Sequence, residues 1–201
     1  MCAVTVAGGV RCWGGNDYGQ ARVPDGLVGA TGLVVAVSAG WTHTCVLLAN
    51  GTARCWGSNS ERESTGNPLD DPNFLVASVV AGNEATCVVA AANRTVKCFG
   101  KLAYVVPRIL GPVQQIGAPR DQHNCALTAA GVVQCWGATS NFWGINGLKG
   151  VATISVGDTF SCATLTSGKL RCSGGAKYNP LPELRNASSR AVVVDLSAGS
   201  E

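Results

Sequence analysis

The spacing of the cysteines constrains this chain more than any other feature. Ten cysteines fall into five pairs, and nine or ten residues separate the two members of each pair. Asn50-Gly51 lies between Cys45 and Cys55, and this dipeptide favours the positive φ angles of a hairpin turn. If residues 49–51 form a three-residue loop with Gly51 left-handed, the two cysteines face each other in a non-hydrogen-bonded pair, with Cα atoms about 4.5 Å apart. A disulfide accepts roughly 4.4–6.8 Å between Cα atoms, so it can bridge this hairpin without bending the backbone.

The same arrangement of two cysteines around a turn recurs along the chain. Three further pairs enclose nine residues, and Cys87 and Cys98 enclose ten, which suits a four-residue loop. Six or more cysteines normally leave the connectivity open, but here the repeat removes most of that ambiguity. The predicted disulfides are Cys2–Cys12, Cys45–Cys55, Cys87–Cys98, Cys125–Cys135 and Cys162–Cys172.

The cysteine pairs belong to a longer repeat. The second cysteine recurs at positions 12, 55, 98, 135 and 172, in steps of 43, 43, 37 and 37 residues. Each unit reads as a short apolar strand, a bend and a bridged hairpin, and no segment has a sustained helical period. Several strands in each period of about 40 residues are typical of a β-propeller. The predicted fold is an all-β propeller of about five repeats, either closed with five blades or part of a seven-bladed propeller.

The repeats form a single array over residues 1–201, with approximate units 1–32, 33–76, 77–114, 115–151 and 152–191. The chain ends with "AVVVDLSAGSE", a phrase that elsewhere precedes the first cysteine of a pair. Residues 192–201 are therefore expected either to complete the first blade, which would remove an exposed edge, or to mark a cut through a longer array. One repeat position, expected to pack between blades, holds Trp13, Trp56, Phe99 and Trp136.

Composition and cysteine usage indicate a compartment. Charged residues make up only 13% of the chain, the net charge of +3 does not argue for a nucleic-acid partner, and no run of 18 apolar residues occurs. Facing cysteines indicate an oxidising, extracellular or secretory compartment. Because no signal peptide follows Met1, the sequence is expected to be a fragment of a secreted protein. Three acceptor sequons predict glycosylation at Asn50, Asn93 and Asn186, the first two on hairpin tips.

Three phrases carry a family resemblance: "GWTHTC", "NGTARCWGSN" and "CWGGNDYGQ". They resemble the regulator-of-chromosome-condensation repeat family, which implies a propeller, usually of seven blades. The paired cysteines resemble its extracellular crinkly-type branch, found in the ectodomains of receptor-like kinases. This chain departs from the family in having five units and no kinase segment, and its Asn-x-x-Gly-Gln ending survives only at Asn16, Gly19 and Gln20.

The sequence offers little catalytic chemistry. His43 and His123 stand where other repeats have Ala85 and Phe160, so packing or turn roles are expected. Pairing of every cysteine leaves no thiol nucleophile and no thiolate zinc ligand. Asp70-Asp71 lies in a proline-containing loop and is expected to form a turn. No phosphate loop, nucleophile elbow or metalloprotease motif occurs. We therefore expect no enzyme, no metal and no cofactor in this segment.

Two sets of residues are candidates for ligand binding. A cation precedes the second cysteine in four repeats, and such a ring could attract an anionic ligand. Alternatively, these side chains lay their stems across the neighbouring blade and keep their charges in water. Aromatic anchors in "TSNFWGIN" are the second set. The cations of the first set are Arg11, Arg54, Lys97 and Arg171, and the aromatic residues of the second set are Phe142 and Trp143.

The expected function is recognition of a protein, peptide or glycan by an extracellular propeller, which could be the ectodomain of a receptor-like kinase. No direct membrane contact is expected in this segment. The alternative is an intracellular propeller that regulates a small GTPase by nucleotide exchange, as the founding branch of the family does. Paired cysteines and sequons favour the extracellular function.

Overall fold

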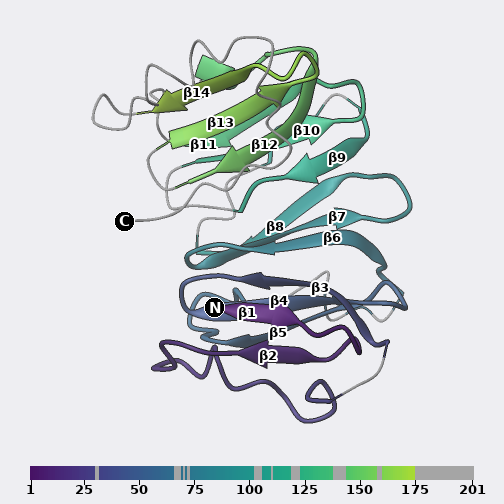
Figure 1. The fold of residues 1–201 in the computed structure, drawn as a ribbon, viewed down its shortest axis with the longest axis vertical. Helices are drawn as coiled ribbons and strands as arrows, with labels where there is room; N and C mark the ends of the chain where they lie inside the picture. Colours follow the sequence, from purple (N-terminus) through teal and green to yellow (C-terminus); the bar gives the residue numbers. More distant parts are fainter. Residues whose placement is uncertain are drawn as a thin grey trace. The chain divides into compact units, whose positions relative to one another are not determined.

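The computed structural model describes residues 1–29, 32–65, 69, 71, 73–101, 106–109, 111–118, 123–137, 144–157 and 160–174. These residues form fourteen β-strands, arranged in one two-stranded and four three-stranded antiparallel sheets (Figure 1). The chain divides into two compact units, Met1–Val106 (unit 1) and Pro107–Glu201 (unit 2). Among the described residues, no helix is long and apolar enough to span a membrane.

Unit 1 contains three sheets in chain order, each a meander of neighbouring strands. In Figure 1, β6–β8 lie next to β3–β5, which in turn lie next to the short β1–β2 hairpin. The strands are β1 (Cys2–Val4), β2 (Val10–Cys12), β3 (Val34–Ala39), β4 (His43–Leu48), β5 (Ala53–Gly57), β6 (Val76–Ala81), β7 (Ala85–Ala90) and β8 (Val96–Gly100).

Unit 2 repeats the three-stranded meander twice, in the orders β9-β10-β11 and β12-β13-β14. Its strands are β9 (Val113–Ile116), β10 (His123–Thr128), β11 (Val133–Gly137), β12 (Val151–Val156), β13 (Phe160–Leu165) and β14 (Leu170–Gly174). Both unit 1 and unit 2 therefore contain the predicted repeat of a short apolar strand, a bend and a hairpin.

The hairpin turns follow from the local sequence. Gly51 has φ of 84°, and the Leu48 amide donates to the Thr52 carbonyl over 2.8 Å, which closes a three-residue loop. This loop places Cys45 opposite Cys55 in the strand register. The predicted hairpin geometry is confirmed.

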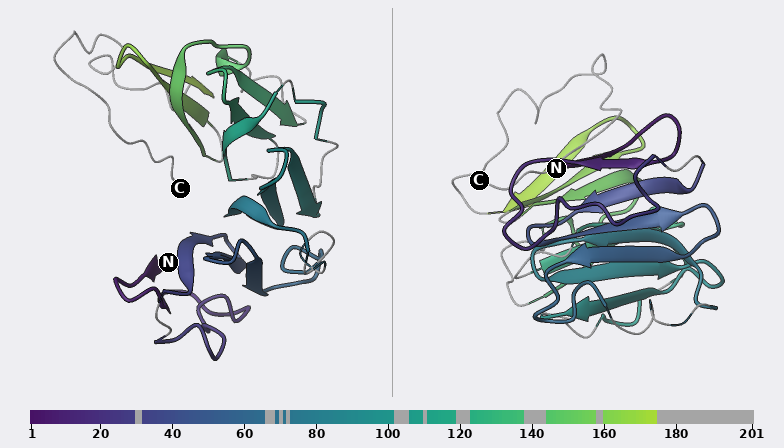
Figure 2. Two further views of the ribbon diagram at one scale, coloured as in Figure 1. Left: turned by 90° about the vertical axis from the view of Figure 1, so that its right-hand side faces the viewer. Right: turned by 90° about the horizontal axis from the view of Figure 1, so that it is seen from below.

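The strands of each sheet run antiparallel, so successive connections lie at opposite ends of the sheet (Figure 2). We call the end with the hairpin loops the tip side, and the end with the bend before each first cysteine the bend side. At the bend after β3, the Gly40 amide donates to the His43 carbonyl over 2.9 Å, and the Trp41 amide donates to the Gly82 carbonyl of the next bend. A Cβ atom at Gly40 would collide with that Gly82 carbonyl, so this close approach requires glycine.

The hydrophobic cores lie between consecutive sheets. In unit 1, the disulfide face of one sheet packs against the face of the next sheet that carries the aromatic position. Cys12 and Val10 pack with Val46 and Trp56. In the following layer Cys45 packs in one cluster with Phe99. In unit 2, Cys125 and Cys135 lie in one cluster with Ile154 and Ala163 of the next sheet.

This packing explains the aromatic repeat position. Trp56 and Phe99 are buried between the sheets of unit 1, as expected, and Trp136 in unit 2 is also buried. For Trp13 the prediction of burial is wrong, because 51% of this residue is exposed. It belongs to β1–β2, the first sheet of unit 1, and no preceding sheet of that unit covers the face that carries Ala3 and Arg11.

The repeat boundaries inferred from the sequence stay predictions. Residues 192–201, expected to complete the first blade, lie outside the described residues.

Candidate functional site

All five cysteine pairs form disulfides, and none of the ten cysteines is free. Their Cα atoms lie 4.0–4.1 Å apart, close to the spacing of a non-hydrogen-bonded pair. Cys45, Cys87 and Cys125 are completely buried. These three cysteines are therefore shielded from solvent, whereas Cys2 and Cys12 are half-buried.

The four cations lie on the last strand of their sheets, and all four are exposed. Arg54 is in register with buried Val46, so its stem starts on a packed face while its charge reaches water. The ammonium of Lys97 lies 4.7 Å from the centre of the Phe74 ring, a cation–π contact. Arg11 lies in unit 1 with these two, whereas Arg171 lies in unit 2.

Several predicted residues lie outside the described residues, namely Phe142, Trp143, Asn186 and Asp70. Asp71 is described, and its carboxylate accepts the Asn73 amide over 2.9 Å while its carbonyl accepts the Phe74 amide. This is a turn, in line with the structural role expected for it. Among the described residues, no three His, Cys, Asp or Glu side chains are grouped closely enough to hold a metal ion.

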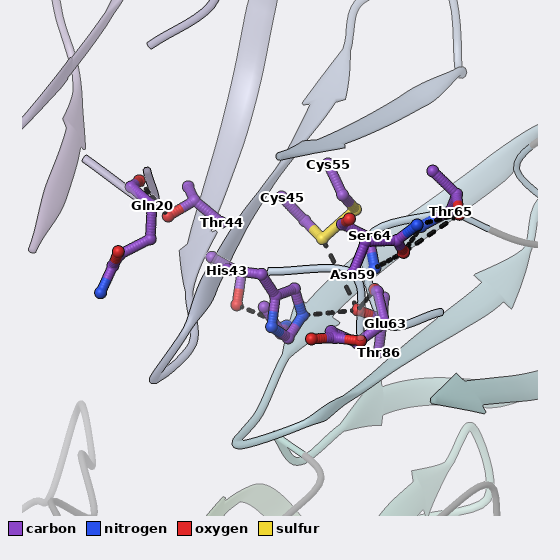
Figure 3. The surroundings of a disulfide bond; sticks show 12 residues. Gln20, His43, Thr44, Cys45, Cys55, Asn59, Glu63, Ser64, Thr65 and Thr86 are labelled. Atoms are coloured by element: carbon purple, nitrogen blue, oxygen red, sulfur yellow. Dashed lines mark hydrogen bonds between the residues drawn. A yellow bond between two sulfur atoms is a disulfide. The ribbon is translucent and has the colours of Figure 1, made fainter. Parts of the chain in front are cut away.

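His43 is buried and contacts the next sheet (Figure 3). Its Nε2 lies 2.7 Å from Oγ1 of Thr86, and the Thr86 hydroxyl donates to the Glu63 carbonyl over 2.7 Å. Because that hydroxyl has a single proton, Nε2 of His43 is the donor and Nδ1 carries no proton. Burial lowers the pKa of His43 to about 4, although the nearby Glu63 acts to raise it. The histidine is therefore neutral near pH 7 and serves packing.

A loop on the bend side recurs in two sheets, which sequence reasoning did not detect. In the first copy, Oδ1 of Asn16 accepts the Ala21 amide over 2.9 Å, and Gly19 has φ of 77°. In the second copy, Oδ1 of Asn59 accepts the Ser64 amide over 3.2 Å, and Arg62 takes the glycine's place with φ of 63°. The two loops begin four residues after Cys12 and four residues after Cys55, which is the signal that could have revealed them.

The last residue of this loop connects adjacent sheets. Oε1 of Gln20 accepts the Tyr18 amide over 2.9 Å, and Nε2 of Gln20 donates to the Trp41 carbonyl over 3.3 Å. The Gln20 carbonyl also accepts from the Thr44 hydroxyl and from Nε1 of Trp56. The loop is thereby held against the bend of the following sheet.

The bend side of unit 1 carries an exposed aromatic surface. Trp13, Tyr18 and Trp41 are 51%, 56% and 63% exposed. Trp13 directly follows β2, Tyr18 lies in the Asn16–Gln20 loop, and Trp41 lies in the bend after β3. We call these three residues the bend-side aromatic surface. Exposed aromatic side chains are frequent anchors of protein interfaces.

A cavity of about 240 Å³ opens beside this surface, lined by residues that include Asp17, Gln20, Trp41 and Thr44. Thr44 is the counterpart of Thr86, since each directly precedes the first cysteine of its pair. At the following interface the His43 side chain contacts Thr86.

Comparison with known proteins agrees with the geometry of the sheets. Residues 34–62 match the regulator of chromosome condensation (RCC1) repeat. The ectodomain of the receptor kinase CR4 from Physcomitrella patens superposes with a TM-score of 0.77 at 23% identity, over 98% of this chain and 55% of that one. The crinkly ectodomain of the Arabidopsis thaliana receptor kinase ACR4 gives 0.70 at 22% identity, over 87% of this chain and 64% of that one.

Prp20p from Saccharomyces cerevisiae, whose binding to Gsp1p and histones has been described, gives a TM-score of 0.61 at 18% identity. That match covers 82% of this chain and 52% of Prp20p. The chain thus spans between about half and two thirds of the solved chains that it matches. Residues 34–62 therefore form a repeat of the RCC1 type, and the similar structures show that the chain has a β-propeller fold, here with five cysteine pairs.

Proposed function

We propose that this chain is an extracellular recognition module, and that it binds a protein, peptide or glycan through the bend-side aromatic surface. The single observation that carries this proposal is that Trp13, Tyr18 and Trp41 are exposed at the same end of the sheets. The hydrogen bond from Gln20 to the Trp41 carbonyl holds two of them on adjacent, anchored segments. Rigid aromatic side chains of this kind supply much of the binding energy of protein interfaces.

Support for an extracellular setting comes from the disulfides and from the likeness to receptor kinase ectodomains. We accordingly propose that the chain belongs to the ectodomain of a receptor-like kinase. The cation positions Arg11, Arg54, Lys97 and Arg171 are a second proposed contact set, for an anionic ligand. Replacing Arg11, Arg54 and Arg171 together with Gln should abolish binding of anionic ligands if that set is used, and should leave it unchanged if the cations only pack.

Arrays of peptides and of glycans, probed with the disulfide-bonded chain, would test the main proposal. Trp41→Ala and Tyr18→Ala should each weaken binding of a retained ligand by tenfold or more. A matched control is Val6→Ala, which removes an exposed apolar side chain from the β1–β2 hairpin loop on the tip side. Equal loss of binding in the control and in Trp41→Ala would reject the bend side as the ligand surface.

The alternative proposal is an intracellular regulator of a small GTPase, favoured by the likeness to Prp20p. It requires reduced cysteines, since the cytosol and nucleus keep thiols reduced. Labelling of free thiols in protein from its native source separates the two proposals. Ten reactive thiols after denaturation would support the GTPase regulator, and none would support the extracellular module.

A further inference from the structure

We propose that Asn50 and Asn93 both carry N-linked glycans, and that these glycans cover the tip side of unit 1. Both residues are exposed, and both lie in the hairpin loops of consecutive sheets, between β4 and β5 and between β7 and β8. The proposal concerns the end of the sheets opposite the bend-side aromatic surface and does not depend on what that surface binds.

The two sequons share one local geometry. Oδ1 of Asn50 accepts the Thr52 amide over 3.0 Å and the Thr52 hydroxyl over 2.8 Å. Oδ1 of Asn93 accepts the Thr95 amide over 3.2 Å and the Thr95 hydroxyl over 2.7 Å. With the amide oxygen held toward the turn, the side-chain nitrogen that carries a glycan faces away from it. Among the described residues neither Nδ2 has a hydrogen-bond partner, so the folded hairpins can accept a glycan without losing a contact.

The loops flank one exposed apolar residue, Leu75. The Leu75 carbonyl accepts the Ala91 amide of the second hairpin over 2.9 Å. Its side chain lies against Gly51 of the first hairpin, and the following amide, that of Val76, donates to the Gly51 carbonyl over 2.8 Å. Leu75 is nevertheless 46% exposed. Glycans on both sides would shield this apolar surface and would keep the tip side from acting as a binding surface.

The reaction requires a lipid-linked pyrophosphoryl oligosaccharide as the donor. The asparagine Nδ2 loses one proton and forms a bond to C1 of the first sugar. The bond between C1 and the pyrophosphate oxygen breaks, and the lipid pyrophosphate leaves. No change of oxidation state is involved. Transfer occurs on the nascent chain, so the role of the folded hairpins is to accommodate the product.

Secretion of the full chain from a eukaryotic host, behind a cleavable signal peptide, would test both sites. The amidase that hydrolyses the side-chain amide between Cγ and the glycosylated Nδ2 releases the glycan as a glycosylamine and leaves Asp, so peptide mass spectrometry in heavy-oxygen water marks each occupied site. We expect Asn50 and Asn93 both to be marked. Thr52→Val and Thr95→Val should each remove one glycan, whereas the matched Thr52→Ser and Thr95→Ser keep the sequon and should retain it. An unmarked Asn50 or Asn93 in the secreted protein would overturn the proposal.

Covering of the tip side is measured separately, on the native glycoprotein. Hydroxyl-radical labelling of Leu75 should rise at least twofold when the glycans are removed enzymatically from the folded protein. Labelling of Trp41 on the bend side serves as the internal control and should not change. Equal labelling of Leu75 before and after removal would show that the glycans leave the tip side open. Loss of ligand binding in Trp41→Ala has no bearing on either result, so the two proposals can fail independently.

Discussion

Glu63 occupies in the second sheet of unit 1 the position that Gln20 occupies in the first. Each side chain accepts the amide two residues before it, Glu61 over 2.8 Å in one case and Tyr18 over 2.9 Å in the other. Gln20 then donates from Nε2 to the Trp41 carbonyl, whereas the second oxygen of Glu63 is buried with no hydrogen-bond partner in the part of the chain described. At this repeat position the amide of Gln20 forms a hydrogen bond with each of its two polar atoms, whereas the carboxyl group of Glu63 uses only one of its oxygens toward the residues described.

Glu63→Gln should therefore stabilise the protein. The substitution replaces a carboxyl oxygen that has no partner among the described residues by an amide nitrogen, and it removes an acidic group that is 0% exposed. An unsatisfied buried polar group costs about 1–3 kcal/mol, and the free energy of unfolding should rise by an amount in that range. Chemical denaturation at pH 7 measures it. The reverse substitution, Gln20→Glu, should destabilise by less, because Gln20 is only half-buried. A stability loss in Glu63→Gln would contradict this account.

Protonation of His43 should make the fold acid-sensitive. Burial lowers the pKa of His43 to about 4 in the folded state, whereas the unfolded chain keeps the ordinary pKa of 6.5. Between about pH 6.5 and pH 4 the unfolded chain therefore binds a proton at His43 and the folded chain does not. Stability is therefore lost as the pH falls through this window. The difference between the two pKa values corresponds to about 3 kcal/mol once the pH reaches 4. Urea unfolding at pH 7, 6 and 5 would follow the loss.

His43→Gln keeps a neutral donor toward Thr86 and removes the titration. Its stability should change less between pH 7 and pH 5 than that of the native chain, by about 2 kcal/mol. Carboxylates that titrate in this range affect both proteins and cancel in the comparison. Parallel pH profiles for the two proteins would show that His43 does not cause the acid sensitivity.

The burial of each disulfide should determine how much it contributes to the free energy of unfolding. Cys2–Cys12 and Cys45–Cys55 close loops of the same sequence separation, 10 residues, so their chain-entropy contributions are equal, at about 3 kcal/mol. Cys45 is completely buried, whereas Cys2 and Cys12 are half-buried. The double variant Cys45→Ala with Cys55→Ala should lose more stability than Cys2→Ala with Cys12→Ala, because it also leaves a cavity. Equal losses in thermal unfolding would exclude a packing role.

The hairpins could be predicted from the sequence because their information is local. Asn50-Gly51 and the spacing of Cys45 and Cys55 determine the loop, the register and the facing pair without reference to any other part of the chain. Trp13 shows the limit of this reasoning, since its burial depends on whether another sheet covers its face. A repeat position describes the environment shared by interior sheets and does not describe the sheet at the end of a unit.

The recurring bend-side loop escaped prediction for a different reason. Glycine is the residue expected at positive φ, and Arg62 breaks that pattern although it adopts the same conformation as Gly19. Asn59 compensates, because its side-chain oxygen accepts the amides of both Ser64 and Thr65. Hydrogen bonds accepted by one asparagine thus hold a loop that has no glycine at the position of positive φ.

Gln115 should be a specific link between the two sheets of unit 2. Its Nε2 donates to the Ile154 carbonyl over 2.8 Å, and its Oε1 accepts the Ile154 amide over 3.0 Å, so one side chain satisfies both backbone groups of a residue on β12. Gln115→Glu removes the donor and sets a carboxylate against that carbonyl. The free energy of unfolding should fall by about 1–3 kcal/mol, since a backbone carbonyl loses its partner. Gln114→Glu is the matched control, because the neighbouring Gln114 is exposed, and it should leave stability unchanged within about 0.5 kcal/mol. Hydrogen exchange of the Ile154 amide provides a local measurement, and it should accelerate in Gln115→Glu and not in the control. Unchanged protection of that amide in Gln115→Glu would show that the contact does not hold the two sheets together.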